Sequence, residues 1–373
     1  MFEPLSKIPG GMRYYYGAEA RLRRAVEDTI MDIFDGWAYE EITTPCVDYL
    51  ALFERGMGHE QAHRAFRFAD GDGRLLALRP DVTSSVARAA ATLLAAQQRP
   101  LRLCYAAPVF RQQPSSHAEW RRETRQLGGE LVGAGGSAAE METLSIAVEI
   151  LETLHLRHKY RITINSVEVF HGIVEGLALD EIQREEMRHL VDTRDAAGLQ
   201  GFLAAFPTDE AERAAFARVI QLSGKREILD KARRIITNQR SVAALDDLES
   251  LWGIIESMQL ADSCDIDLGD VSNLDYYTGL TFKIYVAGAG TRVGGGGRYD
   301  HLTANFGRAE PAVGFVLDLD ALTDVLMRNG EAAKVRFAAR EVFQQTDEEP
   351  EAQLADARRR RALRERVRIN FTG

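Results

Sequence analysis

The first residues whose types and spacing could do chemistry are His59-Glu60-Gln61-Ala62-His63. This string matches HExxH, in which two histidines one helical turn apart bind zinc and the glutamate activates a water molecule. Its neighbours argue against that role. Gly56 and Gly58 precede the string and strand-like sequence begins at Phe66, so no long helix can hold both imidazoles on one face. No third ligand follows nearby, and we therefore predict a polar loop without a metal site.

A run of four glycines, Gly294 to Gly297, is the second candidate, and Arg298-Tyr299-Asp300 follows it. The run has neither the Lys-Ser/Thr of a P-loop nor the GxGxxG spacing that opens a dinucleotide-binding helix. Two interpretations stay open: a flexible turn, or backbone that is kept bare so that a ligand can approach closely. No GxSxG nucleophile motif occurs. The three cysteines form no CxxC, which indicates reduced thiols rather than a disulfide framework or a cysteine zinc site.

Six further segments carry the remaining acidic, basic and aromatic candidates. Each segment alone is compatible with part of an ordinary strand, so it is their order along the chain that carries information. In that order they are LRPDVT (78–83), VFRQQP (109–114), RETRQLGGE (122–130), LDYYTG (274–279), GGGGRYD (294–300) and PAVGF (311–315).

The elements that must position these segments are strands toward both ends of the chain, with helices between them. Residues 18–37 carry apolar residues at helical spacing, which predicts an amphipathic helix. They are Leu22, Val26, Ile30, Ile33 and Phe34. Further helices are predicted at 83–98 and 137–156. Strands are predicted at 42–44, 66–68, 75–78, 101–111, 121–133, 161–169, 264–271, 280–288 and 311–322.

This order of elements favours an α+β fold, with a largely antiparallel sheet flanked by helices. A block rich in Glu, Arg, Ala and Leu interrupts the strands and predicts a helical insertion. We expect a core in two parts, a solvated helix or disorder in the tail, and no internal repeat. The expected divisions are 1–171 for the first part of the core, 172–260 for the insertion, 261–330 for the second part of the core and 331–373 for the charged C-terminal tail.

Composition narrows the function further. The chain has 373 residues and a formal net charge of −10, which disfavours non-specific binding to nucleic acid. No apolar run approaches the roughly 18 residues that a membrane span needs, and the first residues lack the apolar core of a secretory signal. We therefore expect a soluble cytoplasmic protein that has no membrane partner.

Taken in order, the six segments resemble the core of class II aminoacyl-tRNA synthetases, and specifically histidyl-tRNA synthetase. Helix 18–37 with YEEITTP looks like the first motif of that family, the dimer-forming helix and strand. FR…QLGGE looks like the second motif, a strand-loop-strand, and PAVGFVLDLDAL looks like the third. LDYYTG and GGRYD match its histidine-specific signatures. The resemblance covers roughly residues 5 to 325 and implies a class II synthetase-like sheet.

The departures from that family fall on the residues that handle ATP. Arg111 matches the second-motif arginine that contacts the α-phosphate. Gln113 replaces a glutamate of the phosphate and metal arrangement, Ser272 replaces an arginine specific to the histidine enzymes, and Ala321 replaces the third-motif arginine. Asp318 adds negative charge near the phosphate position. Losing one such charge-stabilising donor typically costs about 10²–10³ in rate. The resemblance therefore implies a chain that makes no histidyl-adenylate and contributes no catalytic residue.

The half of the synthetase that binds tRNA is also missing. That family carries a C-terminal anticodon-binding domain, whereas this chain has about 43 residues after Gly330. Seven arginines lie between Arg358 and Arg368, but an arginine-rich helix beside an acidic patch is usually a solvated face. We expect no tRNA partner.

The histidine pocket of the family is better preserved. A carboxylate such as Asp81 can pair with an ammonium, Glu130 can accept from an imidazole N–H, and tyrosine hydroxyls can donate or accept. Asp81 is one methylene shorter than the glutamate of the family. The resemblance assigns histidine binding to Asp81, Thr83, Arg111, Gln126, Glu130, Tyr276, Tyr277 and Tyr299.

A synthetase core that keeps a histidine pocket and lacks the phosphate and tRNA parts resembles the regulatory subunit of ATP phosphoribosyltransferase. That resemblance implies a hetero-oligomer, usually a hetero-octamer, with the short-form catalytic subunit. It also implies a homodimer through the first-motif helix and strand, feedback inhibition by histidine in the first step of histidine biosynthesis, and no cofactor. Two alternatives stay open: an adenylate-forming ligase that acts without tRNA, and a plain histidine-binding module.

Overall fold

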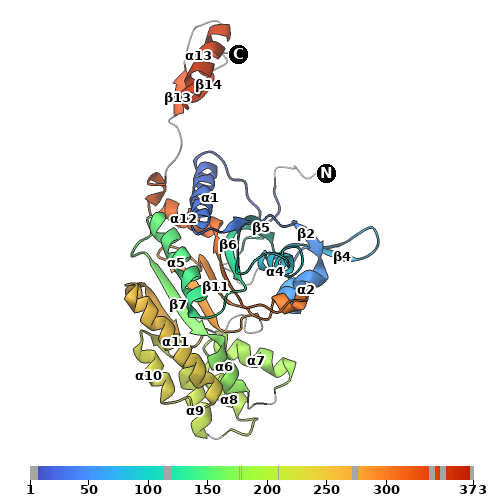
Figure 1. Cartoon of the computed structure of the whole chain (residues 1–373), viewed down its shortest axis with the longest axis vertical. Coiled ribbons are helices and arrows are strands. Elements are labelled where there is room, and N and C mark those ends of the chain that lie inside the picture. The colour runs from blue at the N-terminus through green and yellow to red at the C-terminus, as the bar shows by residue number, and fades with distance from the viewer. Residues whose placement is uncertain are drawn as a thin grey trace. The chain divides into compact units, whose positions relative to one another are not determined.

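The computed structural model describes residues 7–112, 120–175, 177, 179–208, 210–270, 276–335, 341–344 and 350–369. The chain divides into two compact units, Met1–Ala332 and Ala333–Gly373. Figure 1 shows the elements of each unit. Among the described residues, no helix is both long enough and apolar enough to cross a membrane.

The larger unit is built on a mixed sheet. From β5 to β7 every neighbouring pair is antiparallel, whereas β1 joins β5 and β9 joins β7 in parallel. The predicted α+β fold with a largely antiparallel sheet is confirmed. In the described part of the chain the strand order is β1 (Glu40–Glu41), β5 (Leu101–Phe110), β6 (Glu123–Val132), β12 (Ala312–Asp318), β11 (Gly294–Arg298), β10 (Leu280–Val286), β7 (Tyr160–Ser166), β9 (Cys264–Asp267) and β8 (Ser223–Gly224).

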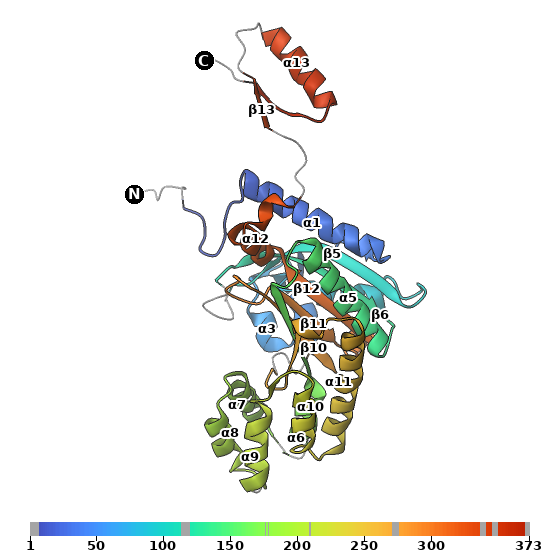
Figure 2. The ribbon, with the colours of Figure 1, turned by 90° about the vertical axis from the view of Figure 1, so that its left-hand side faces the viewer.

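Three helices pack together along this sheet. α1 (Ala18–Gly36) is the predicted amphipathic helix. Four of its five predicted apolar residues are buried, and the fifth, Ile33, is half-buried. Phe34 at its end packs against Phe315 of β12, with ring centroids 5.8 Å apart. α1 contacts both α5 (Ser137–Thr153) and α12 (Leu319–Arg328), as Figure 2 shows.

A second group of elements lies between β1 and β5 in the sequence. β3 (Arg67–Ala69) and β4 (Leu75–Leu78) form the predicted hairpin, and β2 (Val47–Tyr49) pairs with β4. α2 (Leu50–Met57) and α3 (His59–His63) follow one another, separated by Gly58 at φ 84°. The predicted polar loop at 59–63 is therefore wrong, because a left-handed glycine lets the chain start a second, short helix. α4 (Thr83–Ala91) is shorter than the predicted 83–98.

Several predicted segments differ from the observed elements. The predicted strand 311–322 ends at Asp318, because α12 begins at Leu319. β1 ends at Glu41, although the Ile42 N–H still donates to the Cys104 carbonyl at 2.8 Å. Val167–Val169 begin α6 (Val167–Val174) instead of continuing β7, because β-branched residues on a buried helical face resemble a strand in sequence. The glycine run is not a flexible turn: Gly294–Arg298 is β11, which pairs with β10 and β12.

The helical block is present where the composition changes. It has its own buried cluster, which includes Met187, Val191, Leu199 and Leu203. After α6 its helices are α7 (Glu181–Asp192), α8 (Ala196–Leu203), α9 (Glu210–Val219), α10 (Glu227–Arg233) and α11 (Gln239–Ser257). Short 3-10 turns lie at η1 (Ala261–Ser263), η2 (Thr303–Phe306) and η3 (Glu331–Ala333).

The smaller unit contains a helix between two strands. β13 (Glu341–Gln344) and β14 (Arg366–Ile369) pair in parallel, and α13 (Pro350–Ala362) connects them. Arg359 and Arg360 of α13 both pair with Asp356. The sequence predicts a solvated helix or disorder here and misses the strands, because four residues are too few for an alternating pattern to be recognised.

Candidate functional site

Residues from four separate segments meet where α4 begins. Thr83 is the first residue of α4, and its hydroxyl donates to Glu130 Oε1 of β6 at 2.8 Å. The Tyr299 hydroxyl, just after β11, donates to Glu130 Oε2. Tyr276 lies 5.5 Å from Tyr299 and 4.9 Å from Tyr277 between ring centroids. The fold thus gathers Thr83, Glu130 and all three predicted tyrosines.

The Glu130 carboxylate is fully buried in a cage of hydroxyl groups. Besides Thr83 and Tyr299, Tyr105 of β5 donates to Oε1 at 3.1 Å. Burial raises the pKa of Glu130 to about 7, although the three hydroxyl hydrogen bonds favour its ionised form. Two donors meet Oε1 and one meets Oε2 in these bonds, so Oε2 keeps the capacity to accept one more. An imidazole N–H could donate this additional hydrogen bond to Oε2.

Glycines make the room for this cage. A Cβ on Gly314 of β12, which pairs with Glu130, would overlap the carboxylate. On Gly128, a Cβ would lie 2.5 Å from the Tyr105 hydroxyl, and on Gly297 of β11 it would lie 2.9 Å from the Tyr277 ring. The bare backbone at Gly128, Gly297 and Gly314 therefore accommodates side chains of the site. The run is a strand and not a flexible turn, and close approach of a ligand to it stays a prediction.

Among the predicted site residues, two buried acceptors have no hydrogen-bond partner in the described part of the chain: Asp81 Oδ1 and Gln126 Oε1. Asp81 precedes α4, and its other oxygen accepts from the Ser84 hydroxyl at 3.1 Å. Burial raises the pKa of Asp81, while the Ser84 hydrogen bond and the charge of Arg111 oppose the rise. An unmade hydrogen bond on a buried acceptor costs about 1–3 kcal/mol, so both oxygens are well suited to a donor-rich ligand such as an ammonium.

Gln126 and Arg111 lie farther from the centre of the cage. Gln126 and Glu130 are four residues apart on β6, so they face the same side of the sheet. Arg111 directly follows β5 and acts on Asp81 through its charge. The structure brings the start of α4, Glu130 and the three tyrosines together, with Arg111 acting on Asp81 by charge and Gln126 farther along β6. The role of all eight predicted residues in holding histidine stays a prediction.

Sequence reasoning missed two residues of the site. Tyr105 bonds Glu130, and Ser84 bonds Asp81. Tyr105 stands in an apolar strand, where a tyrosine is expected in the core. The register of β5 against β6 could have indicated it. Tyr105 lies opposite Gly128, which has no side chain and so leaves space for the tyrosine.

The region that would handle ATP is acidic and internally paired. Ala321 is in the first turn of α12, and its N–H donates to the Asp318 carboxylate at 3.0 Å. Burial, and secondarily the charge of Asp320, raises the pKa of Asp318 to about 6. Asp320 accepts from Arg23 at 2.6 Å and from the Arg125 N–H at 2.9 Å.

The nearby guanidinium groups already have carboxylate partners. Arg121 pairs with Asp324 at 2.6 Å, and Arg125 forms two hydrogen bonds with Glu27 at 2.6 and 2.7 Å. A triphosphate would have to break these pairs to recruit the arginines. Gln113 and Ser272, the other two departures from the synthetase pattern, lie outside the described residues.

Comparisons with known proteins agree with this geometry. A family model described as Histidyl-tRNA synthetase matches residues 11–322. The ATP phosphoribosyltransferase regulatory subunit of Syntrophotalea carbinolica is 35% identical over 334 residues, which cover 89% of this chain and 78% of that relative. The chain belongs to the family of ATP phosphoribosyltransferase regulatory subunits. A second family member, from Moorella thermoacetica, is also 35% identical and covers 89% of this chain and 84% of its own.

A solved structure supports the same assignment. A chain from Bacillus halodurans, described as an ATP phosphoribosyltransferase regulatory subunit/histidyl-tRNA synthetase, has a TM-score of 0.84 at 25% identity. The match covers 98% of this chain and 93% of that one. The curated relatives are named as regulatory subunits. The chain described here is accordingly a non-catalytic subunit with a synthetase-like fold.

The buried Glu130 gives a testable pH dependence of stability. Its pKa is about 7 in the folded chain against 4.5 for an ordinary glutamate, so between these values the folded state binds more protons. The free energy of unfolding contributed by Glu130 is therefore present at low pH and falls as pH rises toward 7, by an amount on the order of 1–3 kcal/mol. Urea unfolding of the native chain and of Glu130→Gln across pH 5 to 8 measures it.

Asp318, whose pKa is raised to about 6, contributes the same sign of slope in both proteins and cancels in the comparison. The stability difference between native chain and variant should shrink as pH rises to about 7 and then level off. A difference that does not change with pH would show that Glu130 is ionised throughout.

Proposed function

We propose that this chain serves as the regulatory subunit for a short-form ATP phosphoribosyltransferase and conveys histidine occupancy to it. The observation that carries the proposal is a division within the synthetase-like core. The side predicted to hold histidine keeps a caged Glu130 and two buried acceptors, on Asp81 and Gln126, that have no hydrogen-bond partner within the described ranges. The nucleotide side has Ala321 in place of an arginine, next to the buried carboxylates of Asp318 and Asp320.

The pocket chemistry complements histidine at both ends. The α-ammonium would donate to Asp81 Oδ1 and Gln126 Oε1, and the imidazole N–H would donate to Glu130 Oε2. Tyr276, which packs against Tyr277 and Tyr299, would supply an aromatic wall for the ring. These residues are on separate strands and loops, so a ligand that joins them favours one arrangement of α4 and β6 over others.

Feedback inhibition then requires histidine to bind the less active state of the complex more tightly. A coupling of about 1–3 kcal/mol is typical of allosteric proteins. The proposed complex is a hetero-octamer with the catalytic subunit, in which copies of this chain pair through α1 and the β1 segment. This chain would supply no group to the transferred phosphoribosyl.

The decisive experiment combines the purified chain with a short-form catalytic subunit and measures transferase activity during a histidine titration. We expect the chain to co-elute with the catalytic subunit, to raise its activity and to make it sensitive to histidine. Glu130→Gln should retain activation and require more histidine for inhibition. Absence of co-elution and of activation would overturn the proposal.

The same preparation separates the alternatives. An adenylate-forming ligase would support amino-acid-dependent pyrophosphate exchange with ATP and magnesium, which the paired arginines near α12 argue against. Robust exchange by the purified chain would favour the ligase. Histidine binding without any effect on the transferase would favour a plain binding module.

A further inference from the structure

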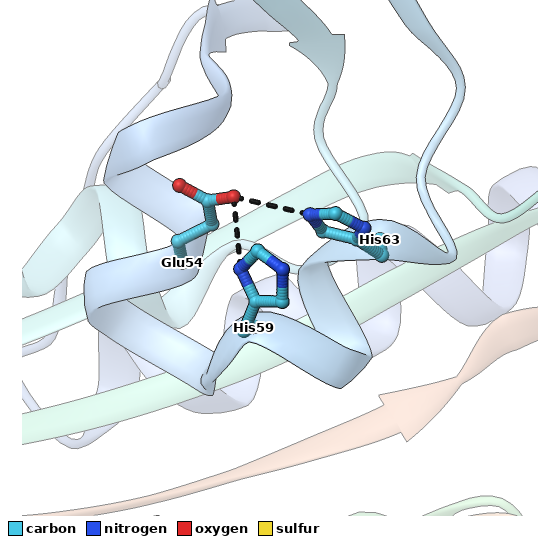
Figure 3. A group of neighbouring side chains, drawn as sticks. All are labelled: Glu54, His59 and His63. Carbon is cyan, nitrogen blue, oxygen red and sulfur yellow. Dashed lines mark hydrogen bonds and ion pairs between the residues drawn. The ribbon is translucent and has the colours of Figure 1, made fainter.

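The HExxH string, which the regulatory function does not use, lies beside a third candidate ligand. His59 and His63 begin and end α3, and Glu54 stands on the preceding α2. Glu54 Oε1 is 3.1 Å from His59 Nδ1 and 3.2 Å from His63 Nε2. One ligand atom from each residue lies within 4.8 Å of the other two. Figure 3 shows both imidazoles turned toward the same carboxylate oxygen.

This spacing suits a small cation with nitrogen and oxygen ligands. Zinc lies about 2.0–2.1 Å from imidazole nitrogen and carboxylate oxygen, so the two measured separations would subtend angles of about 100° at the metal. That is close to the tetrahedral angle. Two histidines and one glutamate are a known zinc ligand set, which leaves a fourth position for water. The Glu54, His59 and His63 side chains are 30%, 73% and 38% exposed, so a metal ion can reach them from solvent.

The sequence argument against this site depended on the absence of a long helix and of a following ligand. Neither is needed here. α3 is only five residues long, yet it places the two rings with centroids 3.7 Å apart. The third ligand precedes the string, and the break at Gly58 turns α3 back so that Glu54 faces it.

Arg67 opposes metal binding in the structure as it stands. Its guanidinium lies 3.1 Å from His63 Nδ1, and a guanidinium can only donate. Nδ1 therefore holds a lone pair, which puts the proton of neutral His63 on Nε2, the nitrogen that faces Glu54. A metal ion at Nε2 would move that proton to Nδ1 and displace Arg67, which is exposed and can swing into solvent.

We propose that Glu54, His59 and His63 form a binding site for Zn²⁺ or a chemically similar first-row divalent cation. The site is separate from the histidine pocket and involves none of its residues. Arg67 lowers the affinity for the metal ion, because its hydrogen bond to His63 Nδ1 favours the tautomer that carries the proton on Nε2, the nitrogen that would bind the metal.

The test is titration of the full chain, free of any histidine tag, with Zn²⁺ by calorimetry and with Co²⁺ by visible absorption. We expect one site and the absorption of a tetrahedral cobalt complex. His59→Ala and Glu54→Gln should each weaken binding at least about tenfold, because each removes one of three ligands. Arg67→Gln should strengthen it several-fold, a result that a merely structural cluster would not produce.

His171→Ala is the matched control, since His171 contacts one glutamate, Glu168, at 3.0 Å, and the described residues place no second histidine in a metal-binding group with it. Its cobalt spectrum and zinc affinity should equal those of the native chain. Zinc affinity that is unchanged in His59→Ala and Glu54→Gln, or that falls in Arg67→Gln, would overturn the proposal. Thermal unfolding without metal checks that each variant is folded.

Discussion

Histidine is expected to bind Glu130→Gln about tenfold to a hundredfold more weakly than it binds the native chain. The ionised carboxylate offers the imidazole N–H a charge-assisted acceptor, whereas the glutamine amide presents a neutral oxygen and two donors of its own. A buried donor left without its acceptor costs about 1–3 kcal/mol. Calorimetry at about pH 8, above the pKa of about 7, keeps the native carboxylate ionised.

Glu142→Gln provides the matched control for this substitution. Glu142 is a half-buried glutamate that likewise has a tyrosine partner, Tyr39, and it pairs with Arg102 outside the predicted site. Its replacement should leave histidine affinity unchanged. Equal affinity of Glu130→Gln and the native chain would remove Glu130 from the binding site, and the chain would then have to hold histidine elsewhere.

The Asp320→Ala chain should lose about 3–5 kcal/mol of its free energy of unfolding. Asp320 is 1% exposed and accepts hydrogen bonds from Tyr15, Arg23 and the Arg125 N–H. Removing one partner of a buried ion pair leaves the other charge uncompensated, which is the costly case. Because these donors come from the N-terminal segment, α1 and β6, the loss would also loosen how α12 packs. Urea unfolding at pH 7 measures the effect.

Asp324→Ala tests whether burial is the cause. Asp324 is on the same helix and pairs with Arg121, but its side chain is 22% exposed. Its removal should cost about 1 kcal/mol or less, as for pairs that water can still reach. Equal losses from the two substitutions would show that the Asp320 network is no stronger than an ordinary surface pair.

Much of the fold could be predicted from periodicity alone. α1 repeats apolar residues at helical spacing, and the hairpin of β3 and β4 turns at Asp-Gly. Periodicity could not predict the secondary structure of segments whose intrinsic propensity is overridden by tertiary packing. Val167 and Val169 are β-branched and favour a strand, yet they lie in the first turn of α6. Both side chains are buried there, and this burial stabilises the helix.

Most residues of the candidate site could be predicted from the sequence, but the hydrogen bonds between them could not. Motif order pointed to Glu130 and Asp81, and the structure places both near the start of α4. No pattern indicates that Tyr105 shares Glu130 with Thr83, because that contact depends on the register of β5 against β6. Likewise Glu54 and His63 are nine positions apart, and only the turn at Gly58 makes them neighbours.

The four glycines of β11 carry an entropic consequence. Each glycine in a strand interior is destabilising by roughly 0.5–1 kcal/mol relative to alanine, since the unfolded chain is freer there, so the run disfavours folding by about 2–4 kcal/mol. The aromatic packing of Phe315 on β12 against Phe34 and Phe282 helps to offset that cost. This entropic cost accompanies the space that Gly297 leaves for the Tyr277 ring.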